Sequence, residues 1–336
     1  MTENILELKD LSVCYHSMDG PVWAVDHVDL KLGVGENLGL VGESGCGKTT
    51  IIKSIMQLLP RNSETHGEVL YKGDNLLKYS NAEIRKIRWN KISMVAQSAM
   101  NALDPVYRVG NQIVEAIREH RDMSKDEAWK QAERLFALVG VGKERLHDYP
   151  HQFSGGMRQR AVIAMALALS PDIIIADEPT TALDVIVQAQ ILNKIRELQR
   201  EINNSMILVT HDISVVAETC DKIAVMYAGK IVEYGDVIEV FERPYHPYTM
   251  GLKNAFADVK GEQFELISIA GHPPNLLNPP EGCRFADRCP FATDLCREEA
   301  PESVEVADGH MVACHHIDRV EEIRTDALKS ETWVKV

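Results

Sequence analysis

Residues 42–49 of this chain read Gly42-Glu43-Ser44-Gly45-Cys46-Gly47-Lys48-Thr49. They match the phosphate-binding loop pattern G-x-x-x-x-G-K-[ST], and they lie between an apolar strand, NLGLVG, and a helical segment, TTIIKSIMQLL. The glycines allow backbone N–H groups to surround phosphates, and the following helix directs its positive end at them. We expect Lys48 to reach the β- and γ-phosphates and the Thr49 hydroxyl to hold Mg²⁺. The stretch therefore predicts an α/β core that binds a nucleotide.

A second motif supplies the acidic residues that such a site needs. Residues 173–178 form an apolar run that ends in Asp177 and Glu178. Asp177 suits a contact with the water shell of Mg²⁺, and Glu178 suits the base that activates the attacking water. Beside a phosphate-binding loop, this pair indicates nucleotide hydrolysis.

Bulk composition excludes several classes of protein. The chain has 336 residues, enough for about two domains, and its 45% hydrophobic content is typical of a globular protein. The longest apolar run, residues 161–169, is about half of a membrane-spanning helix. The N-terminus has no signal-peptide pattern. The net charge of −14 argues against broad binding to nucleic acid.

Residue patterns place the motifs on secondary structure. Alternation around Asp19-Gly20-Pro21 predicts antiparallel strands near the N-terminus. Capping-box patterns at residues 80–83 and 124–127 predict helix starts, and residues 124–140 have the spacing of an amphipathic helix. We expect residues 98–165 to be mostly helical. The runs at 172–178 and 205–212 are typical of buried parallel strands.

Residues 153–157, Phe153-Ser154-Gly155-Gly156-Met157, resemble the LSGGQ signature of ATP-binding-cassette (ABC) ATPases. The resemblance covers about the first 250 residues and implies an α/β nucleotide-binding domain at 1–250. Such a domain has a RecA-like phosphate-loop core, an antiparallel β-subdomain and an α-helical subdomain, here about 98–165. Phe153 and Met157 depart from the usual Leu and Gln, but the Ser-Gly-Gly centre is kept.

The same resemblance implies roles for individual residues. They are adenine stacking for Tyr15, phosphate contact for residues 42–49 and Thr50, γ-phosphate sensing and Mg²⁺ binding for Gln97, inter-subunit contact for Asp184, and the switch histidine for His211. Ser154, Gly155 and Gly156 of one subunit would close on the γ-phosphate held by another. The cofactors implied are ATP and Mg²⁺, and ATP-dependent dimerisation follows.

Further motifs resemble the ATPases of dipeptide and oligopeptide importers: Tyr149-Pro150-His151-Gln152, His246-Pro247-Tyr248-Thr249 and the tail PPNLLNPPEGCRFADRCPFA. The resemblance implies a second, homologous ATPase as heterodimer partner, two membrane-spanning permease subunits docking near residues 98–110, and indirectly an extracytoplasmic solute-binding protein. The chain would act at the cytoplasmic face of the cell membrane. The family also includes importers of oligosaccharides and of nickel. A soluble cassette ATPase acting on nucleic acid or ribosomes is the rival reading, and intact Glu178 and His211 argue against a non-hydrolysing regulatory cassette.

Four of the seven cysteines lie in the C-terminal segment 251–336: Cys283, Cys289, Cys296 and Cys314. Their wide spacing fits the short knuckles of structural zinc sites poorly, whereas a cluster larger than one ion tolerates looser spacing. The importer ATPases that this tail resembles carry a 4Fe–4S cluster there. We therefore expect a small cysteine-rich iron–sulfur domain, with zinc and free thiols as the alternatives.

Overall fold

The computed structural model describes residues 3–96, 102–179, 204–255 and 269–334. The chain divides into two compact units. The first unit comprises residues 1–5, 32–37 and 78–209, and the second comprises residues 6–31, 38–77 and 210–336. The predicted acidic motif and signature belong to the first unit, and the phosphate-binding loop and the cysteine tail belong to the second.

Parallel strands form the sheet portion of the first unit: β6 (Ile92–Val95), β7 (Ile173–Asp177) and β8 (Ser205–Thr210). β7 pairs in parallel with β6 on one side and with β8 on the other. Every residue of β7 and β8 is buried, as expected for short apolar runs that are covered on both faces. The predicted buried parallel strands are confirmed.

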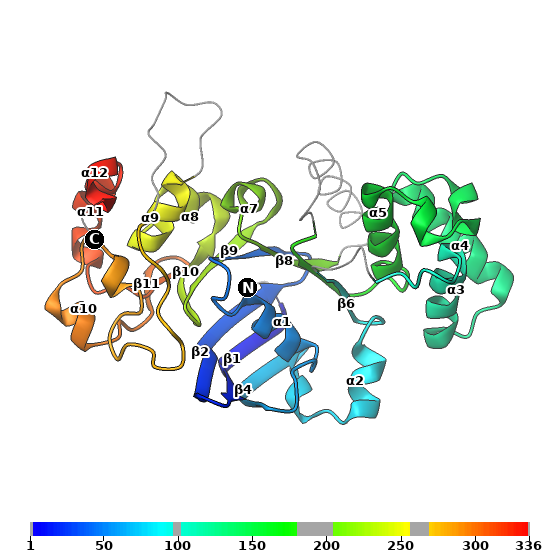
Figure 1. The fold of residues 1–336 in the computed structure, drawn as a ribbon, viewed down its shortest axis with the longest axis horizontal. Coiled ribbons are helices and arrows are strands. Elements are labelled where there is room, and N and C mark those ends of the chain that lie inside the picture. The colour runs from blue at the N-terminus through cyan, green and yellow to red at the C-terminus, as the bar shows by residue number, and fades with distance from the viewer. Residues whose placement is uncertain (1–2, 97–101, 180–203, 256–268, 335–336) are drawn as a thin grey trace. The chain divides into compact units, whose positions relative to one another are not determined.

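Helices and loops make up most of the other described residues of the first unit, and Figure 1 shows α3, α4 and α5 grouped together. The α-helices are α2 (Asn81–Ile87), α3 (Val109–His120), α4 (Lys125–Leu138) and α5 (Gly155–Ala166). Two 3₁₀ turns, η3 (Lys143–His147) and η4 (Pro150–Gln152), join α4 to α5.

Both predicted capping boxes start a helix in the first unit. The Ser80 hydroxyl accepts the Glu83 N–H before α2, and the Ser124 hydroxyl accepts the Glu127 N–H before α4. Glu83 and Glu127 in turn accept the backbone N–H of their serines, which satisfies donors that the helix leaves open. The buried face of α4 contributes to the core of the first unit, and its Phe136 is fully buried.

An antiparallel sheet forms one layer of the second unit, in the order β2-β1-β4-β5. Its strands are β1 (Asn4–Ser17), β2 (Gly20–Gly33), β4 (Ser63–Tyr71) and β5 (Asp74–Asn75). β1 pairs antiparallel with β4, and the register shifts between Lys9 and Ser12. The intervening Asp10 has φ 50, so the bulge occurs at a left-handed residue. The expected N-terminal β-strands are confirmed.

A mixed set of strands forms the second layer of this unit, in the order β11-β12-β10-β9-β3. These strands are β3 (Asn37–Val41), β9 (Lys222–Tyr227), β10 (Lys230–Asp236), β11 (Val304–Ala307) and β12 (His310–Val312). β3 and β9 are parallel, whereas β10 is antiparallel to both β9 and β12. The tail hairpin β11–β12 therefore extends the sheet that carries the phosphate-binding loop.

Helices flank these strands in the second unit. They are α1 (Lys48–Ile55), α7 (Ile213–Thr219), α8 (Val237–Glu242) and α9 (Pro247–Asn254), and the turn η1 (Leu76–Lys78) follows β5. α1 ends earlier than the apolar run TTIIKSIMQLL suggests, because Gln57 takes a left-handed φ of 47.

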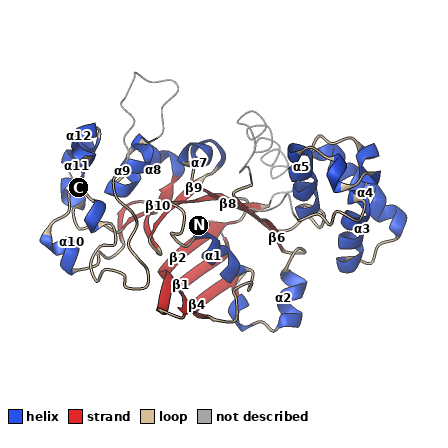
Figure 2. Cartoon of the chain, in the orientation of Figure 1, coloured by secondary structure: helices blue, strands red, loops and turns tan. Residues whose placement is uncertain are grey.

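Besides the hairpin β11–β12, the described part of the C-terminal tail contains short helices joined by loops, as Figure 2 shows. Its helices are η5 (Ala286–Arg288), α10 (Asp294–Glu298), η6 (Ile317–Arg319), α11 (Val320–Ala327) and α12 (Ser330–Trp333). Trp333 is fully buried, and its indole N–H donates to the Ala327 carbonyl at 2.9 Å. Across residues 3–96, 102–179, 204–255 and 269–334, no helix combines the length and apolar character that crossing a bilayer requires.

Candidate nucleotide site

The phosphate-binding loop connects β3 to α1 in the second unit. Gly42 and Gly47 have φ values of 153 and 111, which favour glycine. A Cβ at Gly42 would collide with the Met226 carbonyl oxygen, and one at Gly47 would collide with the Ala24 carbonyl oxygen. The spacing of the motif therefore reflects close backbone approach as well as turn geometry.

Lys48 is the first residue of α1, and its side chain turns back over the loop. Its ammonium donates to the carbonyl oxygens of Gly42 at 2.6 Å and Glu43 at 2.9 Å. Cys46 is buried beside it, and burial raises the pKa of its thiol. A protonated, enclosed thiol is unreactive, so Cys46 fills space in this loop. Lys48 supplies the positive charge at the site.

Tyr15 of β1 lies against the helix that follows the loop. Its hydroxyl and that of Thr50 are 3.2 Å apart, and either can donate. Thr50 is buried within α1, and Thr49 is partly exposed beside it. The structure therefore places Tyr15, predicted to stack on adenine, within reach of the loop's helix.

Two residues whose contact with the loop the sequence did not predict hold Glu43. The Glu43 backbone N–H donates to the Tyr248 hydroxyl at 3.0 Å. The two oxygens of the Glu43 carboxylate accept hydrogen bonds from Nη1 and Nη2 of Arg288, at 2.8 and 3.0 Å. Arg288 stands directly before Cys289 in the chain. The sequence signal that could have indicated this contact was the positive charge of Arg288 in the short turn η5.

The acidic motif ends β7 in the first unit. Asp177 is 3% exposed. Glu178 follows it with a left-handed φ of 46, and its N–H donates to the Val209 carbonyl at 2.9 Å. Non-glycine residues with this conformation are uncommon and cluster at functional positions. Gln159 of α5 donates to the Pro179 carbonyl, so the signature helix contacts the residue after the predicted base. Sequence reasoning did not predict that contact.

The signature segment forms the start of α5. Ser154 is the N-cap residue, its hydroxyl accepting the Met157 N–H at 3.3 Å, and it is exposed. Gly155 and Gly156 open the helix, where backbone N–H groups lack helical partners and favour anions. Phe153 is buried and meets Phe136 edge-on at a centroid distance of 6.4 Å. The unusual Phe153 therefore serves the helical core.

The predicted switch histidine follows β8 in the chain. His211 is exposed, and the next residue, Asp212, caps α7 by accepting the Ser214 N–H at 2.9 Å. Two other predicted residues, Gln97 and Asp184, lie outside the described residues.

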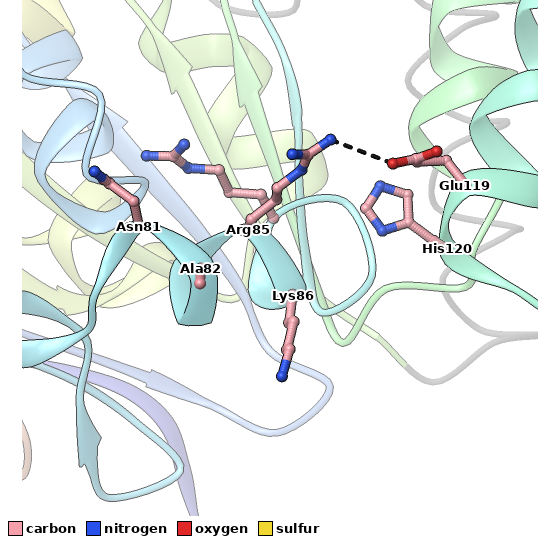
Figure 3. Close-up of a pocket in the computed structure, with 7 residues that line it drawn as sticks. Asn81, Ala82, Arg85, Lys86, Glu119 and His120 are labelled. Carbon is pink, nitrogen blue, oxygen red and sulfur yellow. Dashed lines mark hydrogen bonds and ion pairs between the residues drawn. The ribbon is translucent and has the colours of Figure 1, made fainter.

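A pocket of about 690 Å³ opens in the first unit between α2 and the end of α3. Figure 3 shows Arg85 turned toward Glu119, to which it donates at 3.2 Å. The pocket is lined by Asn81, Ala82, Arg85, Lys86, Arg88, Glu119 and His120. None of these residues belongs to the phosphate-binding loop, the acidic motif or the signature.

All four tail cysteines are free thiols within the second unit. Burial, followed by the charges that Cys283 and Cys296 would carry, raises the pKa of Cys314 to about 11. Burial and the neighbouring cysteines likewise raise the pKa of Cys289. The thiols thus influence one another electrostatically, and four cysteine thiolates are the ligand type that iron–sulfur clusters use. Among the residues that the structure describes, no three His, Cys, Asp or Glu side chains form a group that could hold a metal ion. The iron–sulfur centre stays a prediction.

Comparison with known families and proteins gives matches over most of the chain. The family described as ABC transporter matches residues 25–181, and the family described as oligopeptide/dipeptide transporter, C-terminal region, matches residues 232–296. The dipeptide transport ATP-binding protein DppD of Lactococcus lactis subsp. cremoris is 49% identical over 94% of this chain and 92% of that protein. The oligopeptide transport ATP-binding protein OppD of Escherichia coli K12 is 46% identical over 92% of each.

Solved structures share the cassette fold. The dimeric structure of MJ0796, a bacterial ABC transporter cassette, superposes with a TM-score of 0.63 at 29% identity, covering 69% of this chain and 98% of that one. A post-hydrolysis state of the same cassette, bound to ADP and Pi, gives the same score.

Proposed function

This chain belongs to the ATP-binding subunits of the oligopeptide and dipeptide ABC transporter family, so it is an ATP-hydrolysing transporter subunit, and we propose that it drives uptake of short peptides through separate permeases. The observation that carries this proposal is the family match of the C-terminal region. The family described as oligopeptide/dipeptide transporter, C-terminal region, matches residues 232–296, beyond the motifs that cassettes of many functions share. We assign the cassette to residues 1–250 and the importer-specific extension to residues 251–336.

Each motif has a chemical role in the proposed reaction. Lys48 and the backbone N–H groups of the loop bind the phosphates, and Tyr15 stacks on the adenine. Mg²⁺ bound by Thr49, Gln97 and Asp177 would neutralise phosphate charge. Those roles follow the motif and the family, and the buried Lys48, whose ammonium donates to two carbonyls of the loop, supports them.

Hydrolysis then depends on Glu178. Its carboxylate accepts a proton from the attacking water, and the His211 imidazole hydrogen-bonds the γ-phosphate. The left-handed backbone of Glu178 supports a functional role, because such strain persists where the surrounding structure imposes it.

A second cassette completes the site. Ser154 and the first N–H groups of α5 are available to a partner's γ-phosphate, since Ser154 is exposed at the start of its helix. Asp184 contributes to the same interface. We propose a heterodimer with a homologous ATPase subunit, and the dimeric cassette among the structural relatives supports pairing.

The permease contact lies before α3. Val106 and Tyr107 are 69% and 58% exposed, which is unusual for large apolar side chains placed next to each other. They support a docking surface for a membrane-spanning subunit near residues 98–110. The chain would then be held peripherally at the cytoplasmic face of the membrane, and an extracytoplasmic binding protein would deliver the solute.

The four tail cysteines would hold a 4Fe–4S cluster, which would cross-link the tail and stabilise its fold. Support comes from the donor set, four thiols in one neighbourhood of the second unit. Burial raises the pKa of Cys283, Cys289 and Cys314, so these thiols must release protons when they bind iron. Anaerobically purified protein should contain four irons and four sulfides per chain, and one zinc without sulfide would contradict the assignment.

Glu178→Gln tests the hydrolytic role. Because a general base contributes about 10²–10⁴ in rate, the substitution should lower ATP turnover of the assembled transporter by that factor and leave MgATP binding intact. Peptide uptake into membrane vesicles should fall in parallel. Turnover equal to the wild type would remove Glu178 from the mechanism, and ATP-driven uptake of a solute other than peptides would overturn the substrate assignment.

A further inference from the structure

A buried arginine of the cysteine-rich tail closes on the phosphate-binding loop. Arg288 ends η5, stands next to Cys289 and is 6% exposed. Its Nη1 and Nη2 donate to the two carboxylate oxygens of Glu43 at 2.8 and 3.0 Å. A planar guanidinium that meets both oxygens fixes the orientation of the carboxylate as well as its distance.

The other N–H groups of Arg288 are engaged too. Nε donates to the Ala270 carbonyl at 2.8 Å, Nη1 also donates to the Tyr227 hydroxyl at 3.2 Å, and Nη2 also donates to the Ile269 carbonyl at 3.3 Å. These bonds and the Glu43 pair account for the five N–H donors that a guanidinium has. A side chain held at every donor has little freedom to move, so it can act as a fixed support.

Glu43 is held on its backbone side as well. Its N–H donates to the Tyr248 hydroxyl at 3.0 Å, and its carbonyl accepts the Lys48 ammonium at 2.9 Å. Glu43 therefore connects Arg288 to Lys48, the residue expected to meet the phosphates. A shift of the Glu43 side chain would be passed to the carbonyl that Lys48 contacts.

Charge gives a second reason for the contact. A carboxylate within a loop that binds a polyanion repels the ligand unless a cation neutralises it. We propose that Arg288 is a positioning residue for the phosphate-binding loop: by pairing with Glu43 it holds the loop in shape and cancels a negative charge beside the nucleotide. The inference rests on the proposed ATP-binding function, and it makes the tail a working part of that site.

Arg288→Gln tests the role in the full-length chain and in the assembled transporter. The Kd and KM for MgATP should rise about 10–100-fold, by analogy with residues that orient metal ligands. Turnover at saturating MgATP should change far less, because protein groups engage every N–H donor of Arg288 and it acts on the loop only through Glu43. Arg288→Lys keeps the charge without the paired bonds and should recover part of the affinity.

A rescue separates charge cancellation from general damage. The double variant Glu43→Gln with Arg288→Gln removes both charges, so it should bind MgATP more tightly than Arg288→Gln alone. A matched control is Arg324, another tail arginine, which donates to the Pro244 carbonyl at 2.8 Å and lies 4.6 Å from the Tyr245 ring centroid. Arg324→Gln should leave the affinity for MgATP unchanged.

Three results would overturn the positioning role. They are wild-type affinity in Arg288→Gln, an equal loss in Arg324→Gln, and a double variant that binds no better than Arg288→Gln. If Arg288→Gln fails to fold, Arg288→Lys carries the same comparison, with wild-type affinity as the contrary result. A wild-type chain that binds no MgATP would instead overturn the proposed function itself.

Discussion

His246 makes the stability of the second unit depend on pH. The side chain is 1% exposed at the N-cap of α9, and its Nδ1 accepts the Tyr248 N–H at 3.1 Å. Burial lowers the pKa of His246 to about 3. Protonation would place an N–H on Nδ1, where it would face another donor, so the native state requires the neutral ring.

The magnitude follows from the two pKa values. In the unfolded chain His246 titrates near its ordinary value of about 6.5, so between pH 6.5 and pH 3 the unfolded state binds more protons than the native state. Native stability is therefore fully present above pH 6.5 and is lost as the pH falls toward 3. Each pH unit well inside that window costs about 1.4 kcal/mol, so lowering the pH from 7 to 5 costs about 2 kcal/mol through this group.

The perturbation is His246→Asn, because Asn is a favourable N-cap residue that does not titrate here. Urea unfolding, followed by circular dichroism at pH 7 and at pH 5, gives the decrease in unfolding free energy between the two pH values for each protein. We expect this decrease to be about 2 kcal/mol smaller for His246→Asn than for the wild type. The exposed His272 provides the control, and His272→Asn should keep the wild-type pH dependence. An equal loss in wild type and His246→Asn would refute the reasoning.

Further predictions concern the tail and strand β10, with which it pairs. The fully buried Glu233 carboxylate accepts the Tyr245 N–H at 2.7 Å and meets His310 at 2.8 Å. Glu233→Ala should therefore lower the unfolding free energy by about 3–5 kcal/mol, measured by urea unfolding, and a loss below 1 kcal/mol would contradict this. Trp333→Ala should lower the unfolding free energy by about 3–5 kcal/mol by leaving a cavity, whereas Val334→Ala, at an exposed site, should be neutral in the same urea unfolding assay. Equal effects would show that the tail is not packed on Trp333.

Much of the fold could be predicted because its signals are local. The capping boxes at Ser80 and Ser124 each use residues within one helical turn, and both helices begin where predicted. The apolar runs around 173–177 and 205–210 predicted buried parallel strands for a similar reason, since burial on both faces leaves no alternation. The end of α1 was missed, because the left-handed turn at Gln57 breaks a run whose composition still favours a helix.

The amino-acid sequence alone predicted the chemistry proposed for the site, since the phosphate-binding loop, the Asp177-Glu178 pair and the signature are contiguous patterns, each only a few residues long. Tertiary structure alone decided what supports the loop. Arg288 and Glu43 are 245 residues apart in the chain. The hairpin β11–β12 joins the sheet that contains β3, although the two are distant in sequence. Hydrophobic periodicity and turn propensity reflect interactions between residues close in the chain, whereas the Arg288–Glu43 ion pair depends on how the whole chain folds.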